Sequence, residues 1–201
     1  IMNVWCGGSE AADAICDVLF GDRVPSGKLT MTMPQAVGQI PLYYNHMSTG
    51  RPVPEGIKSY RKYQSNYLDV RNDPLYPFGY GLSYTTFKYS KPRLSADSMA
   101  VDGSVKVSVD VTNTGERDAD EVVQLYIRDL VAKISRPVKE LKGFSRVHIK
   151  AGETRTVEFT IVPDMLKYYD SELNYGLDAG EFTVMTGPDS RRVKGCKLTV
   201  Y

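Results

Sequence analysis

Aromatic and polar side chains gather between residues 43 and 63, and their types suit contact with a sugar. Aromatic faces can pack against the C–H faces of sugar rings, while amide and guanidinium groups bind hydroxyls, as in many small-molecule pockets. A competing interpretation, which we weigh as the stronger, is that the tyrosines attach this loop to a neighbouring domain. The candidate contact residues are Tyr43, Tyr44, Asn45, Arg51, Tyr60 and Arg61.

The acidic and histidine residues form no recognisable catalytic or metal-binding pattern. Glu10, Asp17 and Asp22 lie at the ends of a predicted helix, where carboxylates act as caps and turn acceptors. His46 and His148 are the only histidines and lie in different predicted regions. We place the carboxylates of the C-terminal region mostly on turns or solvated strand faces: Asp118, Asp120, Glu121, Glu153 and Glu158. The sequence therefore predicts no catalytic residue, no metal site and no cofactor in this chain.

Composition excludes several classes of partner. The formal net charge of +1 argues against a nucleic-acid surface, which needs unbalanced Lys and Arg. No apolar run approaches the ~18 residues of a membrane-spanning helix. Cys6, Cys16 and Cys196 have no metal-ligand spacing, and we interpret them as structural thiols, with Cys16 on the buried face of a helix.

Residues 1–34 predict a strand, a helix and a second strand, which would form the end of a layered α/β domain. Residues 1–5 resemble the end of a buried strand, so we expect the chain to begin inside a domain. Ser9 is the expected N-cap, and Gly21 the expected end of the helix. Residues 28–33 alternate as a short strand. The expected buried face of the helix carries Ala12, Ile15, Val18 and Leu19.

Residues 35–84 are irregular and rich in Tyr, Pro and Gly. Their aromatic content argues against disorder, so we expect a long segment packed between domains. From residue 85 to 201 the pattern changes to short alternating runs separated by turn residues. About seven such strands predict an all-β sandwich of the fibronectin type III or immunoglobulin kind.

Several ordered motifs resemble the C-terminal part of glycoside hydrolase family 3, most closely its bacterial periplasmic β-glucosidases. Two dense runs carry the likeness, residues 17–29 (DVLFGDRVPSGKL) and 74–87 (PLYPFGYGLSYTTF). Residues 39–44 (QIPLYY), 111–115 (VTNTG) and 136–144 (RPVKELKGF) add to it. Cys6 departs from the family pattern, since a bulky apolar residue is more usual there.

The resemblance implies a parent enzyme that releases terminal, non-reducing β-D-glucosyl residues with retention of configuration. Its Asp nucleophile and Glu acid/base would lie upstream of Ile1, so this chain alone should be inactive and should support the catalytic domains. Its partners would be those domains and, through them, a β-glucoside or oligosaccharide. The resemblance also implies a periplasmic or secreted enzyme.

Three alternatives remain open at the level of sequence. The parent could be a β-xylosidase or a related exo-glycosidase of the same family. The chain could instead be a non-catalytic module that binds glycan or mediates assembly, although residues 1–34 would then be an orphaned edge. The sandwich could also form the contact of a homodimer.

Overall fold

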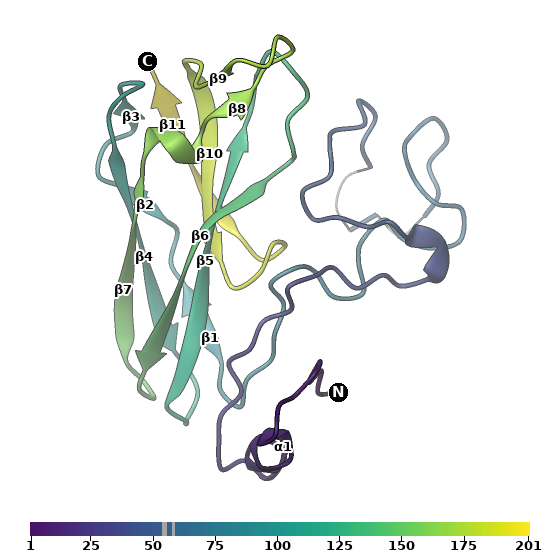
Figure 1. Cartoon of the computed structure of the whole chain (residues 1–201), viewed down its shortest axis with the longest axis vertical. Helices are drawn as coiled ribbons and strands as arrows, with labels where there is room; N and C mark the ends of the chain where they lie inside the picture. Colours follow the sequence, from purple (N-terminus) through teal and green to yellow (C-terminus); the bar gives the residue numbers. More distant parts are fainter. Residues whose placement is uncertain (54–55, 58) are drawn as a thin grey trace.

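The computed structural model describes residues 1–53, 56–57 and 59–201 and contains two contrasting regions. Residues 1–84, here the N-terminal segment, are largely irregular, and residues 85–201 form a β-sandwich (Figure 1). One sheet pairs β4 (Val105–Asn113) with three antiparallel neighbours: β1 (Phe87–Tyr89), β2 (Arg93–Leu94) and β7 (Thr154–Ile161). The all-β sandwich expected from the alternating runs is therefore confirmed.

The second sheet has five strands in the order β3-β11-β10-β5-β6. Its strands are β3 (Ser98–Met99), β5 (Ala119–Asp129), β6 (Glu140–Ile149), β10 (Gly180–Gly187) and β11 (Lys194–Val200). A 3-10 turn, η2 (Pro163–Met165), and a separate two-stranded ribbon of β8 (Tyr168–Tyr169) and β9 (Tyr175–Gly176) complete the region.

The core lies between the two sheets and follows from the period of two along each strand. On β4, Val105, Val107, Val109 and Val111 all face inward and are at most 2% exposed. They pack against inward residues of β5, including Val123 and Leu125. Burial of branched apolar side chains on both inner faces is what stabilises such a sandwich.

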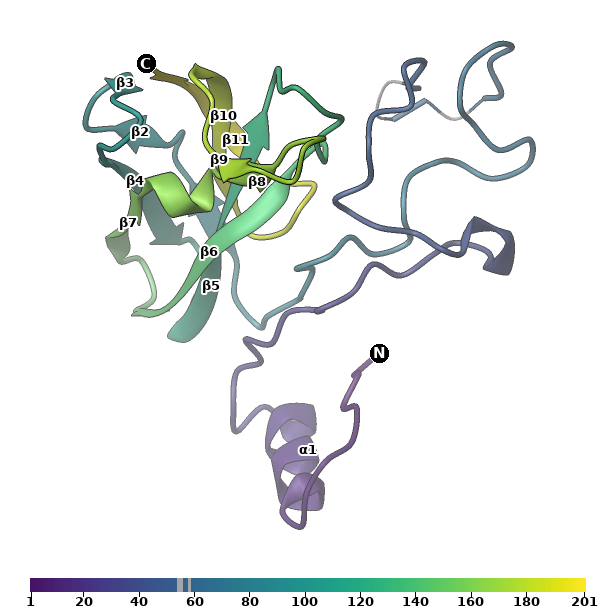
Figure 2. The same ribbon diagram turned by 45° about the horizontal axis from the view of Figure 1, so that its top comes forward.

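The N-terminal segment lies beside the five-stranded sheet as two runs that travel together (Figures 1 and 2). The amides of Leu29 and Gly79 bond to carbonyls of Tyr80 and Leu29 at 2.8 and 2.7 Å, and the Met33 amide bonds to the Tyr76 carbonyl at 2.9 Å. Residues 27–33 and 76–81 are here called the paired run. The strands expected at 1–5 and 28–33 are not formed: the described residues 1–34 contain one isolated bridge, Met33 to Tyr76. Residues 28–33 bond to the run 76–81 at a few points only, and neither stretch adds to a sheet ladder.

The helix α1 (Ala11–Phe20) forms as expected and ends at Gly21 with φ of 87°. Its N-cap is Glu10 rather than Ser9, and no side chain caps it. The expected buried face is wrong in this structure. None of the ten residues of α1 is buried, and Leu19 and Phe20 are 63% and 77% exposed. Cys6 and Cys16 are also exposed, because no layer covers the helix (Figure 2).

Candidate functional site

Five of the six predicted sugar-contact residues lie on the exposed surface of the N-terminal segment. Tyr43 and Tyr60 are 62% and 52% exposed. Asn45, Arg51 and Arg61 are exposed as well. They belong to a loop near the 3-10 turn η1 (Val37–Gln39), and residues 54, 55 and 58 of that loop lie outside the described residues.

The sixth residue, Tyr44, has a different environment because it anchors the loop to the sandwich. Its ring stacks on Phe78 with centroids 4.3 Å apart and meets the edge of Tyr126 at 5.8 Å. Its hydroxyl accepts a hydrogen bond from the Leu141 amide at 3.1 Å. The Val138 amide donates to the His46 carbonyl at 2.9 Å. For Tyr44 the competing interpretation, attachment to a neighbouring domain, describes its contacts.

A buried ion pair joins the N-terminal segment to the inside of the sandwich. The Lys28 ammonium lies 3.1 and 3.0 Å from the two carboxylate oxygens of Glu121 on β5. The Lys28 and Glu121 side chains are only 13% and 3% exposed. The Tyr89 hydroxyl donates to Glu121 Oε1 at 2.7 Å. Burial and the adjacent Glu121 charge raise the pKa of Tyr89 above its ordinary value, so the phenol stays protonated as a donor.

The prediction of a solvated Glu121 is therefore wrong. Glu121 shares the inward face of β5 with Val123 and Leu125, because successive side chains of a strand alternate between faces. The alternation that places Glu121 on the inward face can be read from the sequence. The partner of Glu121 cannot, because Lys28 lies 93 residues away along the chain.

The outer face of β5 holds the paired run by a second group of polar contacts. The Gln124 amide donates to the carbonyls of Gly79 and Pro188 at 3.1 and 2.7 Å. Its oxygen accepts from the Tyr126 hydroxyl at 2.5 Å. The Ser190 amide, in the turn between β10 and β11, donates to the Phe78 carbonyl at 2.9 Å. Gln124 and Tyr126 are thus buried although they face away from the sheet-to-sheet core.

The same turn makes a charged contact with the segment. Arg191 bonds to Asp73 at 3.0 Å, and the Arg192 guanidinium lies 5.5 Å from the ring centre of Tyr80. Asp189 is fully buried and accepts from the amides of Arg191 and Arg192 at 2.9 and 2.7 Å. The turn is therefore held in one shape that presents its arginines to the segment.

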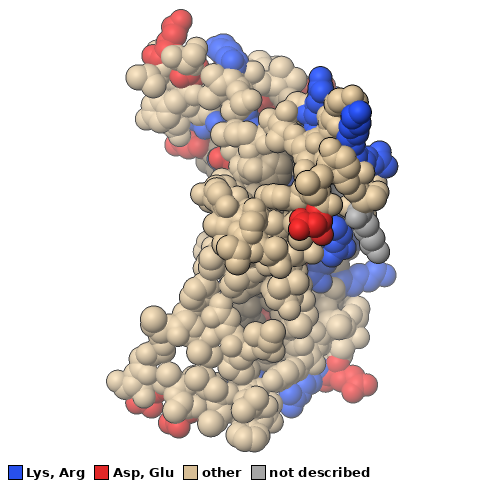
Figure 3. Space-filling model, turned by 90° about the vertical axis from the view of Figure 1, so that its right-hand side faces the viewer, with Lys and Arg blue, Asp and Glu red and all other residues tan. Residues whose placement is uncertain are grey.

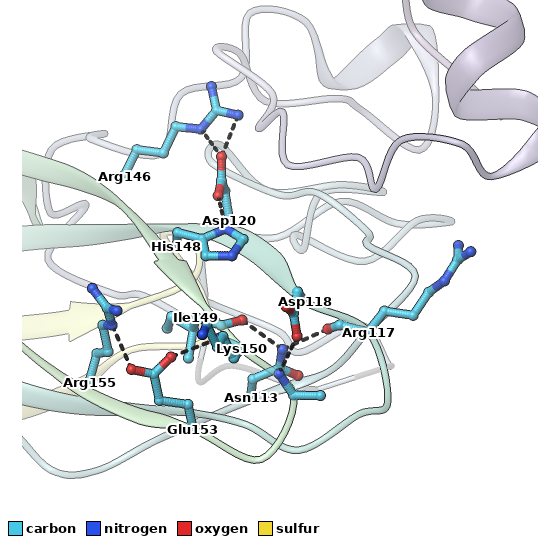
Figure 4. A network of polar contacts seen from close by, with 11 residues as sticks. Asn113, Arg117, Asp118, Asp120, Arg146, His148, Ile149, Lys150, Glu153 and Arg155 are labelled. Atoms are coloured by element: carbon cyan, nitrogen blue, oxygen red, sulfur yellow. Dashed lines mark hydrogen bonds and ion pairs between the residues drawn. The ribbon is translucent and has the colours of Figure 1, made fainter.

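Other polar groups form a cluster at one end of the sandwich (Figure 4). Asp120 accepts from Arg146 at 2.9 Å and contacts His148 Nδ1 at 2.8 Å. The hydrogen bond with His148, supported by Arg146, lowers the pKa of Asp120. Asn113 is fully buried and donates to the carbonyls of Arg117 and Ile149 at 2.7 and 3.0 Å. Asp120, Arg146 and His148 thus form a cross-strand cluster between β5 and β6, and Asn113 bonds to backbone carbonyls near the end of β4.

The buried polar contacts described above join the N-terminal segment to the sandwich. Within the described part of the chain, no group of three or more His, Cys, Asp or Glu residues is placed to hold a metal ion. No described helix is long and apolar enough to cross a membrane. Lys28, Glu121 and Gln124 are among the polar residues that fix the N-terminal segment against the sandwich.

Comparisons with known proteins agree with this two-part organisation. Residues 1–84 match the glycosyl hydrolase family 3 C-terminal domain, and residues 121–190 match the fibronectin type III-like domain. A periplasmic beta-glucosidase of Salmonella typhimurium is 51% identical over 194 residues, which cover 96% of this chain and 25% of that protein. A beta-xylosidase of Formosa agariphila is 45% identical over 202 residues, which cover 100% of this chain and 27% of that protein.

Solved structures show the same likeness. The beta-glucosidase from Listeria innocua, in complex with glucose, superposes with a TM-score of 0.92 at 41% identity. The match covers 98% of this chain and 27% of that one. The chain thus spans about a quarter of the length of the relatives that it matches.

Proposed function

The chain belongs to glycoside hydrolase family 3, in its C-terminal region, and we propose that it is the supporting part of a retaining, exo-acting β-glucosidase. The parent enzyme would hydrolyse terminal non-reducing β-D-glucosyl residues, using an Asp nucleophile and a Glu acid/base that lie outside this chain. The names of the relatives support the activity. Glu121 is engaged at the interface, Asp120 in a cross-strand cluster and Asp189 in a turn, which supports the inactivity of this chain alone.

The observation that carries the supporting role is the uncovered apolar surface of the N-terminal segment. Trp5, Leu19 and Phe20 are all at least 60% exposed. Seen from the side of the segment, residues other than Lys, Arg, Asp and Glu cover the left and centre of the middle of the molecule, and charged residues lie at its ends and along the right-hand side (Figure 3). Large exposed apolar patches are rare on monomers and mark surfaces that pack on something else. In this proposal residues 1–34 complete an α/β domain of the parent, which buries α1.

The proposal divides the chain into residues 1–34 of that α/β domain, a linking segment 35–84 and the sandwich 85–201. The exposed residues Tyr43, Asn45, Arg51, Tyr60 and Arg61 would contact the aglycone side of the substrate. Tyr44 would hold their loop in place. The name of the Salmonella relative supports a periplasmic or secreted location. A homodimer contact on the sandwich stays a prediction, which sedimentation of the complete parent protein would test.

A β-xylosidase activity of the parent is the second candidate, because some relatives carry that name. Glucose and xylose differ by one hydroxymethyl group, and in the proposal the pocket that distinguishes them lies outside this chain. Assay of the complete parent on aryl-β-glucoside and aryl-β-xyloside separates the two candidates.

The supporting role is tested with a chimera. The C-terminal quarter of the Salmonella periplasmic beta-glucosidase is replaced by this chain, and hydrolysis of an aryl-β-glucoside is compared with that of the relative truncated at the junction. We expect activity in the chimera and none in the truncated relative or in this chain alone. Hydrolysis by the chain alone would place a catalytic pair within it and overturn the proposal. An inactive chimera in which both parts remain folded would refute the supporting role.

A further inference from the structure

The Lys28–Glu121 pair occupies an unusual position, because it brings a charge from the surface segment into the sandwich. The ammonium reaches both carboxylate oxygens, and Tyr89 from the opposite sheet bonds to the same carboxylate. Removing one partner from such a buried pair strands the other charge away from water, whereas replacing both partners with uncharged groups can be neutral. The pair therefore adds little net stability, but any arrangement that separates its two charges is strongly disfavoured.

Lys28 belongs to the paired run itself, so the position of the ion pair and that of the run are linked. Its neighbour Leu29 is bonded to Tyr80 and Gly79 through the backbone. Gly81 lies beside the Lys28 stem: a Cβ there would come within 2.9 Å of Lys28 Cδ and 2.4 Å of the Gly27 carbonyl oxygen. A glycine at 81 thus leaves room for the lysine to pass inward.

We propose that Glu121 is a positioning residue, whose buried charge sets the place of the paired run against the sandwich through Lys28. Contacts from Gln124, Ser190 and Arg192 also hold the outer side of the run, but Lys28 is the only charged residue of the run itself. Because the Glu121 carboxylate is buried, a position of the run that withdraws Lys28 leaves this charge without its cation, which is strongly unfavourable. This inference deepens the proposed supporting role and rests on it, because it names the group through which the sandwich would place the rest of the segment.

The test is amide hydrogen exchange in the full chain, with Glu121→Gln and the double variant Lys28→Met with Glu121→Gln. In Glu121→Gln we expect the amides of Leu29, Met33 and Gly79 to exchange at least about tenfold faster, equivalent to about 1.4 kcal/mol of lost local protection. The amides of β4 should keep their protection. In the double variant no charge is stranded, so resistance to urea should recover while the three amides stay fast.

Each other outcome overturns the inference. Equal acceleration in β4 and in the paired run would mean that Glu121 contributes only global stability. Recovery of slow exchange in the double variant would mean that the single variant suffers only from a stranded charge. Unchanged exchange in Glu121→Gln would show that the pair positions nothing. The matched control is Asp110→Asn, which removes the exposed Arg93–Asp110 pair within one sheet and should leave the three amides unchanged. The chimera tests the supporting role separately, so either proposal can fail without the other.

Discussion

Replacement of Gly79 by alanine is a sharp test of how closely the N-terminal segment approaches the sandwich. Gly79 is buried and has φ of +79°, a backbone conformation that residues other than glycine rarely adopt. A Cβ at this position would lie 2.1 Å from Gln124 Oε1 and 2.8 Å from Gln124 Cδ. The end of a glutamine side chain can ordinarily move aside. Gln124 cannot do so freely, because it is buried and bonded to Gly79, Pro188 and Tyr126.

The expected loss can be built from these contacts. Holding alanine at positive φ costs about 1 kcal/mol. Displacing the Gln124 amide disrupts three hydrogen bonds, each worth about 1 kcal/mol when both partners are buried. Gly79→Ala should therefore lower the free energy of unfolding by about 4 kcal/mol, a large share of the roughly 5–15 kcal/mol typical of folded proteins. The corresponding fall in melting temperature is about 8–16 °C for a chain of this size.

The measurement is urea unfolding followed by circular dichroism and tyrosine fluorescence, with Gly152→Ala as the matched control. Gly152 has φ of +75°, and a Cβ there would meet nothing within 4 Å. The Gly152→Ala variant has the same backbone strain but no collision, so its free energy of unfolding should fall by about 1 kcal/mol. The difference of about 3 kcal/mol isolates the contact with Gln124. Equal losses in the two variants would refute the reasoning, since they would show that the Gln124 contacts contribute nothing.

Three further predictions concern other parts of the chain. Leu125→Ala removes a fully buried core side chain and should lower the free energy of unfolding by about 2–5 kcal/mol, measured in urea. The lowered pKa of Asp120 means that its contribution is present above its unfolded pKa of about 3.9 and is lost as pH falls further. The free energy of unfolding of Asp120→Asn is compared with that of the unsubstituted chain at pH 6 and at pH 3. The difference between the two proteins should be smaller at pH 3. Phe20→Ser should leave the stability of the chain within about 0.5 kcal/mol, because Phe20 is exposed, yet reduce hydrolysis by the chimera.

The sandwich could be predicted from the sequence because its information is local. Alternating valines on β4 determine both the strand and its inward face, and a period of two is visible in any short window. The signals for helix α1 are equally local, because Gly21 ends the helix and the apolar residues before it have helical spacing. Its buried face was predicted wrongly because burial requires a second surface, and nothing in the described chain covers Leu19 or Phe20.

The interface could not be predicted in the same way, and β5 shows why. Its inward face reads Glu121, Val123, Leu125, while its outer face carries Gln124 and Tyr126. Alternation alone predicts that the polar residues of such a strand face solvent. Here Glu121 meets a lysine 93 residues away, and Gln124 meets a backbone carbonyl 45 residues away.

The signal that remains in the sequence is a polar residue on the apolar face of a long strand. Such a residue needs a buried partner, because an unpaired charge among valines would cost several kcal/mol, on the order of 3–5. An inward Glu121 therefore points to a buried partner, and only the folded chain identifies Lys28 and the Tyr89 hydroxyl in that place.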